Sequence, residues 1–207
     1  MIDAEPDVDD AVVDVAFALE GKYLARDHAQ ALADALTAHV PWLTGHPTAG
    51  IHPIKLVPGS EPVAWLSRRA RLLLRVPRTR ETALTALEGC TLGVGGSSLR
   101  LGTPKSHPLV PHGTLYAYFV AAGSDDESAF MQGVAADLAT LGITCRTVCG
   151  KHQQRGDEPT ALHGFSLMLH ELTAVDSLTV QRVGLGPHRS LGCGLFVRHR
   201  SAAAVGA

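Results

Sequence analysis

The stretch GLGPHRSLGCG, residues 184–194, separates a predicted helix at 174–183 from an apolar segment at 195–198. Four glycines in eleven residues let the backbone approach a partner closely with its N–H groups pointing outward. A dinucleotide-binding fingerprint is excluded, because its third glycine would fall on Arg189 and because such a loop leads from a strand into a helix. The simpler alternative is a helix end at Gly184 followed by a tight turn into an edge strand.

The residues before this loop alternate between strand and helix patterns. In chain order we expect a strand at 115–121, a helix at 126–141 capped by Ser124 or Asp125, a strand at 144–148, a polar loop at 151–159, a strand at 162–172, the helix at 174–183 and a strand at 195–199. This β-α-β-β-α-β order is that of the ferredoxin-like fold, in which two helices pack on one face of an antiparallel sheet.

The N-terminal half shows a similar order of patterns. We expect a strand at 12–19, a helix at 26–39 capped by Asp27, a loop at 41–50, strands at 51–55 and 64–76, a helix at 80–87 after Thr79, and a hairpin at 91–101 that turns at 95–98. Residues 103–113 contain three prolines, which is typical of a linker. The sequence therefore predicts the α+β class, with two tandem ferredoxin-like (RRM-like) domains at residues 1–112 and 113–207.

Composition predicts a globular protein of the cytoplasm. Hydrophobic residues make up 45% of the chain, yet no run reaches the roughly 18–20 apolar residues of a membrane span. The acidic N-terminus lacks the basic region of a signal peptide. Four cysteines in a chain of this size fit reduced thiols better than a disulfide scaffold.

Charge is distributed unevenly along the chain, although the net charge is only −2. Residues 1–64 contain three Lys/Arg and ten Asp/Glu, whereas residues 65–207 contain fifteen Lys/Arg and ten Asp/Glu. A basic surface can bind phosphate whatever the total charge. Aromatic residues are scarce at 5%, which argues against stacking of bases on an RRM-type platform and favours contacts to phosphates.

Short motifs along most of the chain accompany the glycine-rich loop. They are Asp27-His28, Pro41-Trp42-Leu43, Gly50-Ile51-His52-Pro53-Ile54, Leu99-Arg100-Leu101-Gly102, Thr114-Leu115-Tyr116-Ala117, Leu138 with Leu141-Gly142-Ile143, and Ser177-Leu178 with Gln181. With them the chain resembles the RAMP superfamily. Within it the chain resembles the CRISPR-associated repeat-processing endoribonucleases, the sixth Cas family, and especially the small variant first described in myxobacterial systems.

This resemblance implies an endoribonuclease that cuts a precursor CRISPR transcript within each repeat. The ribose 2′-OH attacks its own 3′-phosphate and leaves 5′-OH and 2′,3′-cyclic phosphate ends. Such a reaction needs no metal or cofactor, but it needs an imidazole near neutral pH and positive groups at the phosphate. The sequence contains no HExxH or Cys-x-x-Cys motif. The implied partners are CRISPR repeat RNA and crRNA, and also other Cas subunits of a surveillance complex, with no membrane.

The family usually places its catalytic histidine near the end of the first helix or in the loop after it. His46, His52 and His39 are therefore the catalytic candidates, in that order, whereas His28 is expected to pack or cap at the start of the helix. A tyrosine or lysine often accompanies the family's histidine, and Tyr23 and Lys55 are the weak matches here.

Three basic groups are candidates for binding RNA. They are Arg68, Arg69 and Arg71, with Arg75, along a predicted strand; Arg146, Lys151 and Arg155, with His152, around a predicted loop; and the glycine-rich loop with Gly184, Gly186, His188, Arg189, Gly192 and Gly194. A solvent-facing strand and an ordinary polar loop are the simpler readings of the first two groups. At the level of function, the alternatives are a non-catalytic RAMP subunit that caps guide RNA and a small-molecule-binding ferredoxin-like protein.

Overall fold

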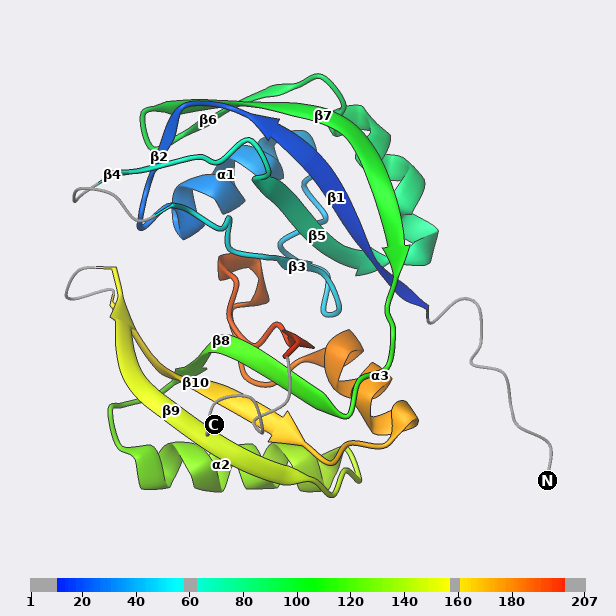
Figure 1. Cartoon of the computed structure of the whole chain (residues 1–207), viewed down its shortest axis with the longest axis vertical. Helices are drawn as coiled ribbons and strands as arrows, with labels where there is room; N and C mark the ends of the chain where they lie inside the picture. Colours follow the sequence, from blue (N-terminus) through cyan, green and yellow to red (C-terminus); the bar gives the residue numbers. More distant parts are fainter. Residues whose placement is uncertain (1–10, 58–62, 157–160, 200–207) are drawn as a thin grey trace. The chain divides into compact units, whose positions relative to one another are not determined.

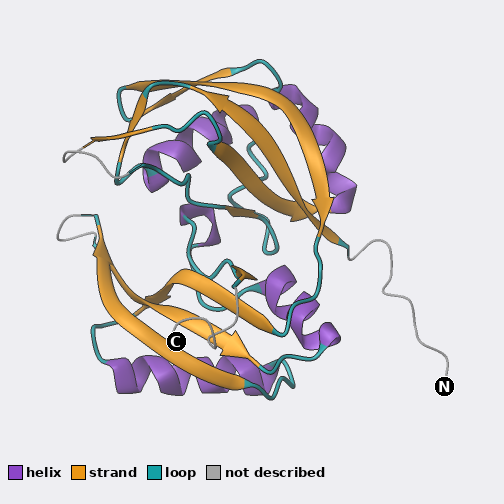
Figure 2. Ribbon diagram, in the orientation of Figure 1, coloured by secondary structure: helices purple, strands orange, loops and turns teal. Residues whose placement is uncertain are grey.

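The computed structural model describes residues 11–57, 63–156 and 161–199. The chain divides into two compact units, residues 1–109 and 110–207 (Figure 1). Each unit contains an antiparallel sheet and helices (Figure 2), so the predicted α+β class is confirmed.

The N-terminal unit contains a sheet with strand order β3-β5-β1-β7-β6. Its elements are β1 (Val12–Glu20), β2 (Tyr23–Ala25), α1 (Ala29–His39), β3 (Gly50–Ile51), β4 (Val63–Trp65), β5 (Arg71–Pro77), the 3-10 helix η2 (Arg78–Leu87), β6 (Thr91–Val94) and β7 (Ser97–Pro108). Central β1 pairs with β5 on one side and β7 on the other. This is the ferredoxin-like arrangement with β6 added at one edge, and β2 and β4 form a separate short ribbon.

Alternation along β1 separates the two faces of this sheet. Val13, Val15 and Phe17 are almost fully buried in the apolar core. Because side chains alternate along a strand, Asp14 and Ala16 point to the opposite face. The register aligns Asp14 with Arg75 of β5, so these two charged side chains share that face.

Several N-terminal elements differ from the predictions. Helix α1 begins after His28, which is its N-cap residue without a side-chain capping bond, and not after Asp27. The strand predicted at 64–76 is two strands, β4 and β5, separated by a turn in which the Ala70 N–H donates to the Ser67 carbonyl. The predicted linker is wrong for most of its length, since β7 continues to Pro108. Beyond Leu101 the described part of β7 pairs only with β1, and an edge of this kind tolerates proline.

The C-terminal unit has the ferredoxin-like strand order β11-β8-β10-β9. Its elements are β8 (Thr114–Ala122), α2 (Glu127–Thr140), β9 (Arg146–Arg155), β10 (Leu162–His170), α3 (Ala174–Val183), the 3-10 turn η3 (Arg189–Leu191) and β11 (Val197–Arg198). Apolar residues of the sheet and helices form one core, in which Phe130 of α2 stacks on Phe165 of β10.

Two C-terminal predictions need correction. Helix α2 is capped by Asp126, whose carboxylate accepts from the N–H groups of Ser128 and Ala129, and not by Ser124 or Asp125. The predicted polar loop from residue 151 is strand up to Arg155, and residues 157–160 lie outside the described residues. Polar residues fit β9 because it is the last strand of the described sheet order and is largely exposed.

Candidate functional site

A charged cluster lies on the face of the N-terminal sheet opposite its apolar core. The Arg75 Nε and Nη2 atoms donate to the two carboxylate oxygens of Asp14 at 2.8 and 2.9 Å. His52 follows β3, and its N–H donates to the Leu73 carbonyl of β5. Its ring nitrogen Nε2 lies 3.7 Å from Asp14 Oδ1. Strands β1 and β5 and the segment after β3 therefore bring together a carboxylate, a guanidinium and an imidazole.

The cluster is well shielded, since Arg75 is 1% exposed and His52 is 7% exposed. Burial by itself would raise the pKa of Asp14, but hydrogen bonds and charge from Arg75 and His52 outweigh it and hold that pKa well below its usual range. Asp14 is therefore ionised at neutral pH. The predicted role of Arg75 in a phosphate-binding run is wrong, because its guanidinium is buried and bound to Asp14.

His46 lies in the loop between α1 and β3 with a different set of partners. Its ring meets the Trp42 ring edge-on, with centroids 6.2 Å apart. The Thr48 N–H points to His46 Nδ1 at 3.4 Å, which favours the tautomer with its proton on Nε2. The Arg80 guanidinium lies over Trp42, 5.6 Å from the ring centroid. His46 is half-buried and thus more accessible than His52.

The two histidines at the ends of α1 are less suited to chemistry. His39 is an exposed residue in the last turn of the helix, where a positive charge favours the helix dipole. His28 is buried, with Nδ1 2.8 Å from the Ala25 carbonyl, and the Ile54 N–H points to Nε2 at 3.3 Å. His28 therefore ties the start of α1 to the segment after β3.

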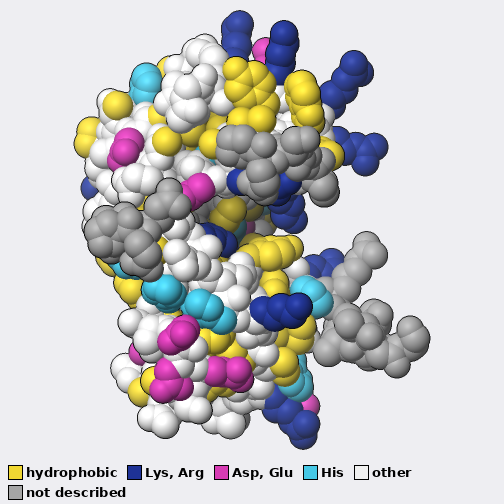
Figure 3. Space-filling model, turned by 90° about the vertical axis from the view of Figure 1, so that its left-hand side faces the viewer, with side chains coloured by type: hydrophobic (Ala, Val, Ile, Leu, Met, Phe, Trp, Pro, Cys, Tyr) yellow, Lys and Arg dark blue, Asp and Glu magenta, His cyan; other side chains and the backbone are white. Residues whose placement is uncertain are grey.

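Arg68, Arg69 and Arg71 are brought together at the start of β5. Arg68 and Arg69 lie in the turn before the strand, Arg71 is its first residue, and all three are exposed. Figure 3 shows Lys and Arg side chains projecting from the surface of the N-terminal unit. These arginines form an accessible basic group, although two of them are in a turn and not on a strand.

The glycine-rich loop owes its shape to contacts within the C-terminal unit. Gly184, Gly192 and Gly194 are buried, and each has a positive φ. A Cβ on Gly194 would collide with the Leu185 carbonyl, and one on Gly184 would collide with the Arg189 guanidinium. The Gly194 N–H donates to the Phe119 carbonyl of β8 at 2.8 Å. Tight folding of the loop thus accounts for these three glycines.

The exposed part of the loop is its tip at Gly186, Pro187 and His188. Arg189 instead folds back, and its Nη2 donates to the Arg182 carbonyl at the end of α3 at 3.1 Å. His188 has the left-handed φ of 65°, which turns the chain into η3. The loop therefore presents His188 outward, while Arg189 is engaged within the unit.

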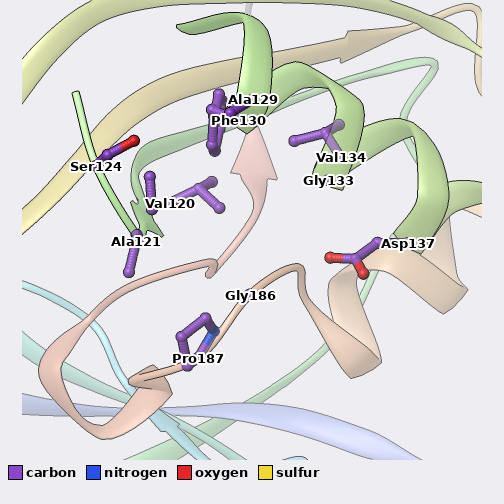
Figure 4. A pocket seen from close by; sticks show the side chains of 12 residues that line it. Val120, Ala121, Ser124, Ala129, Phe130, Gly133, Val134, Asp137, Gly186 and Pro187 are labelled. Atoms are coloured by element: carbon purple, nitrogen blue, oxygen red, sulfur yellow. The ribbon is translucent and has the colours of Figure 1, made fainter. Parts of the chain in front are cut away.

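A pocket of about 290 Å³ lies beside this tip (Figure 4). Its walls come from the end of β8, from α2 and from Gly186 and Pro187, and they are mainly apolar. Asp137 and Ser124 are the labelled polar side chains at its rim (Figure 4).

The basic residues of β9 lie in three separate settings. Arg146 begins the strand and is paired with Glu171 at 3.1 Å, Lys151 is exposed, and Arg155 ends it over the Phe119 ring at 4.2 Å from the centroid. The Phe119 carbonyl accepts from the Gly194 N–H, so Arg155 lies beside the glycine-rich loop.

The thiol of Cys193, in the same loop, is protonated at neutral pH. Burial raises its pKa to about 11, against the opposing effect of the positive charge on Arg155.

Sequence reasoning missed Asp14 as a site residue. Its signal is a lone acidic residue in the otherwise apolar strand 12–19, with an arginine in a second apolar strand. A charge at such a position requires a partner when buried. Of the two residues predicted to support the histidine, Tyr23 is 44% exposed on β2 and Lys55 is exposed, whereas the group beside His52 is Asp14.

Within the described residues, no three His, Cys, Asp or Glu side chains are grouped as metal ligands. None of the described helices has both the length and the apolar character to cross a membrane.

Comparison with known proteins gives a consistent picture. The family model described as Cas6 Crispr matches residues 13–201. A relative from Myxococcus xanthus (strain DK1622), the CRISPR-associated endonuclease Cas6, is 33% identical over 194 residues, which cover 93% of this chain and 84% of the relative.

Solved structures show the same fold. A CRISPR associated protein Cas6 matches with a TM-score of 0.63 and 12% identity, over 91% of this chain and all of that one. A Cas6-related protein of Pyrococcus furiosus matches with a TM-score of 0.59 and 11% identity, over 90% of this chain and 98% of that one. At these identities the likeness concerns the fold alone, and it extends across both ferredoxin-like units.

Proposed function

This chain belongs to the Cas6 family of CRISPR repeat-processing endoribonucleases, and on that premise we propose that it cleaves precursor CRISPR RNA within the repeat without a metal ion. The observation that carries the proposal is the 33% identity to a Cas6 endonuclease over nearly the whole chain, with both ferredoxin-like units included. The coarser function, endoribonuclease action in CRISPR RNA processing, follows from the family. The chemistry below is our proposal.

In the proposed reaction the 2′-oxygen of the nucleotide before the cut bonds to the adjacent phosphorus while its proton passes to an imidazole. The bond from phosphorus to the 5′-oxygen breaks, and that oxygen takes up a proton. The products are a 2′,3′-cyclic phosphate and a 5′-OH. Cations and N–H groups stabilise the extra negative charge on the phosphorane.

Among the histidine candidates, the geometry favours His52 as the proton acceptor, then His46, then His39. A carboxylate beside an imidazole stabilises the imidazolium that forms when it accepts a proton, and His52 has Asp14 in that position. The low exposure of His52 does not disqualify it, because catalytic contacts often tighten only in the complex with substrate. His46 is suited to donating from Nε2, given the Thr48 N–H at its Nδ1.

RNA binding is assigned to the accessible basic groups. Arg68, Arg69 and Arg71 offer three cations in four residues. On the C-terminal unit the exposed Lys151 and His188 and the half-buried Arg155 offer further basic side chains. Arg146 and Arg189 have a smaller part, because Glu171 and the Arg182 carbonyl engage them. The remaining glycines shape the loop, and Gly186 is the one exposed at its tip.

The product crRNA is proposed to stay bound and to join other Cas subunits in the cytoplasm. Phosphate contacts predict that affinity falls steeply with added salt, at about 0.7 in log K per log salt for each contact with single-stranded RNA. If the affinity for RNA does not change with added salt, the alternative of a small-molecule-binding ferredoxin-like protein is favoured.

The test is incubation of the purified protein with its own repeat RNA in excess EDTA. We expect one cut in the repeat, a 5′-OH end and a cyclic phosphate that acid converts to a monophosphate. Tight binding of RNA that stays uncut would instead favour a non-catalytic RAMP subunit. Alanine substitution of His52, His46 and His39 separately, measured in single turnover, assigns the histidine.

A further inference from the structure

We propose that Asp14 is the positioning residue for His52 and that Arg75 holds Asp14 in place. This inference rests on the proposed function, since it concerns the imidazole that receives the 2′-OH proton. It goes further by assigning the group that orients this imidazole, a role that the sequence left between Tyr23 and Lys55.

The first support is the way the backbone brings the three residues together. Asp14 and Arg75 are directly opposite in the β1–β5 register, and Gly50 of β3 is opposite Arg75. His52 lies two residues after Gly50 and remains tied to β5 through its N–H bond to Leu73. Alternation therefore directs all three side chains to one face of the sheet.

The second support is the geometry of the carboxylate. Arg75 binds both oxygens of Asp14 in a fork, which fixes the plane of the carboxylate. Oδ1, one of these oxygens, also lies 3.7 Å from His52 Nε2. That separation is longer than a hydrogen bond, so the carboxylate acts on the ring through its negative charge. When His52 receives the proton from the RNA 2′-OH, the resulting imidazolium faces Asp14.

The third support is that a structural ion pair would be complete without the histidine. The fork between Arg75 and Asp14 already satisfies both charges, yet His52 is added to it and is itself 7% exposed. Other charged or titratable groups that the strand registers place on this face are Arg71 of β5, opposite Ala18, and His107 and Lys105 of β7, opposite Asp14 and Ala16. All three are exposed.

The test compares Asp14→Asn with wild type in single-turnover cleavage of repeat RNA from pH 5 to 9. We expect the maximal rate to fall about 10- to 100-fold while the Kd for uncut RNA changes less than threefold, since general-base catalysis contributes at this scale. The removal of a carboxylate lowers the pKa of a neighbouring imidazole. The rise of the rate with pH should therefore move to lower pH by about one unit.

Three further variants separate positioning from a structural role. Glu20→Gln, on the same strand and exposed, is the matched control and should cleave like wild type. His107→Gln tests whether the other imidazole on this face causes the pH dependence, and it should leave the profile unchanged. Arg75→Lys keeps the charge but not the fork, and it should give an intermediate rate with a near-normal pH profile. It also keeps the proposal testable if Asp14→Asn does not fold.

A second readout does not require cleavage. The His52 ring signals can be titrated by NMR in the full-length wild-type protein and in Asp14→Asn, with assignment by His52→Gln. We expect a lower imidazole pKa in Asp14→Asn. In cleavage, Asp14→Asn combined with His52→Ala should be no slower than His52→Ala alone, because the two residues act as one unit.

The outcomes distinguish this inference from the proposed function. If wild type never cuts repeat RNA, the proposed function is wrong, whatever Asp14 does. If wild type cuts and His52→Ala is inactive, but Asp14→Asn keeps both the wild-type rate and the wild-type His52 titration, the positioning role is overturned. It is also overturned if Asp14→Asn slows the reaction but leaves the pH profile and the His52 titration unmoved.

Discussion

The two units each contain a segment with candidate functional residues, and these two segments are built in opposite ways. Around His52, side chains from β1 and β5 supply the charge, and the backbone is ordinary strand. In the loop at 184–194 the backbone itself is unusual, with four glycines at positive φ and a hydrogen bond to β8. Substitutions that remove a charge should therefore destabilise the segment around His52, and substitutions that add side-chain volume should destabilise the glycine-rich loop.

The largest effect is expected from volume in the glycine loop. Gly194→Ala would place a Cβ against the Leu185 carbonyl at a φ of 63°, where a side chain is also strained. We expect the variant to lose about 3 kcal/mol or more of stability, measured by urea unfolding. A near-wild-type midpoint would show that the loop can relax and would remove the contrast between the two segments.

The next effect comes from breaking the charged cluster. Arg75→Ala leaves Asp14, whose side chain is 17% exposed, without its main partner. Loss of one member of a buried pair costs about 3 kcal/mol. Arg71→Ala on the same strand is the control, and because Arg71 is exposed it should change stability by less than about 0.5 kcal/mol. If both variants lose the same stability, the paired hydrogen bonds between Arg75 and Asp14 do not stabilise the protein.

The difference between the segments also explains what could be predicted from sequence. Helix α3 was predicted at its observed bounds, because Thr173 caps its start and Gly184 ends it locally. Asp14 and Arg75 are 61 residues apart, so their pairing depends on a strand register that periodicity alone does not give. The continuation of β7 beyond Leu101 was missed because Pro104 and Pro108 resemble linker residues until the unpaired edge of this strand is known. The inward fold of Arg189 depends on the loop conformation, which composition does not specify.

A smaller effect should appear when pH titrates the charged cluster. The pKa of Asp14 is lowered in the folded protein from an unfolded value of about 3.9, so its stabilisation is present above pH 4 and is lost as pH falls towards the folded pKa. The stability gap between wild type and Asp14→Asn should therefore narrow by about 1 kcal/mol between pH 4 and pH 3. Urea unfolding at both values measures it. If the stability difference between wild type and Asp14→Asn is the same at both pH values, Asp14 affects stability by a means other than its charge.

The smallest effect tests whether glycine volume matters only where the backbone is crowded. Gly133 lies inside α2, and a Cβ there would meet no other described atom within 4 Å. Alanine favours the helix over glycine by about 0.5–1 kcal/mol, so Gly133→Ala should stabilise the protein by that amount in the same urea measurement that shows Gly194→Ala to be destabilised. If Gly133→Ala raises stability and Gly194→Ala lowers it, the need for glycine in the loop comes from its crowded, left-handed backbone. A loss of stability in Gly133→Ala would mean that glycine is required in this unit for another reason.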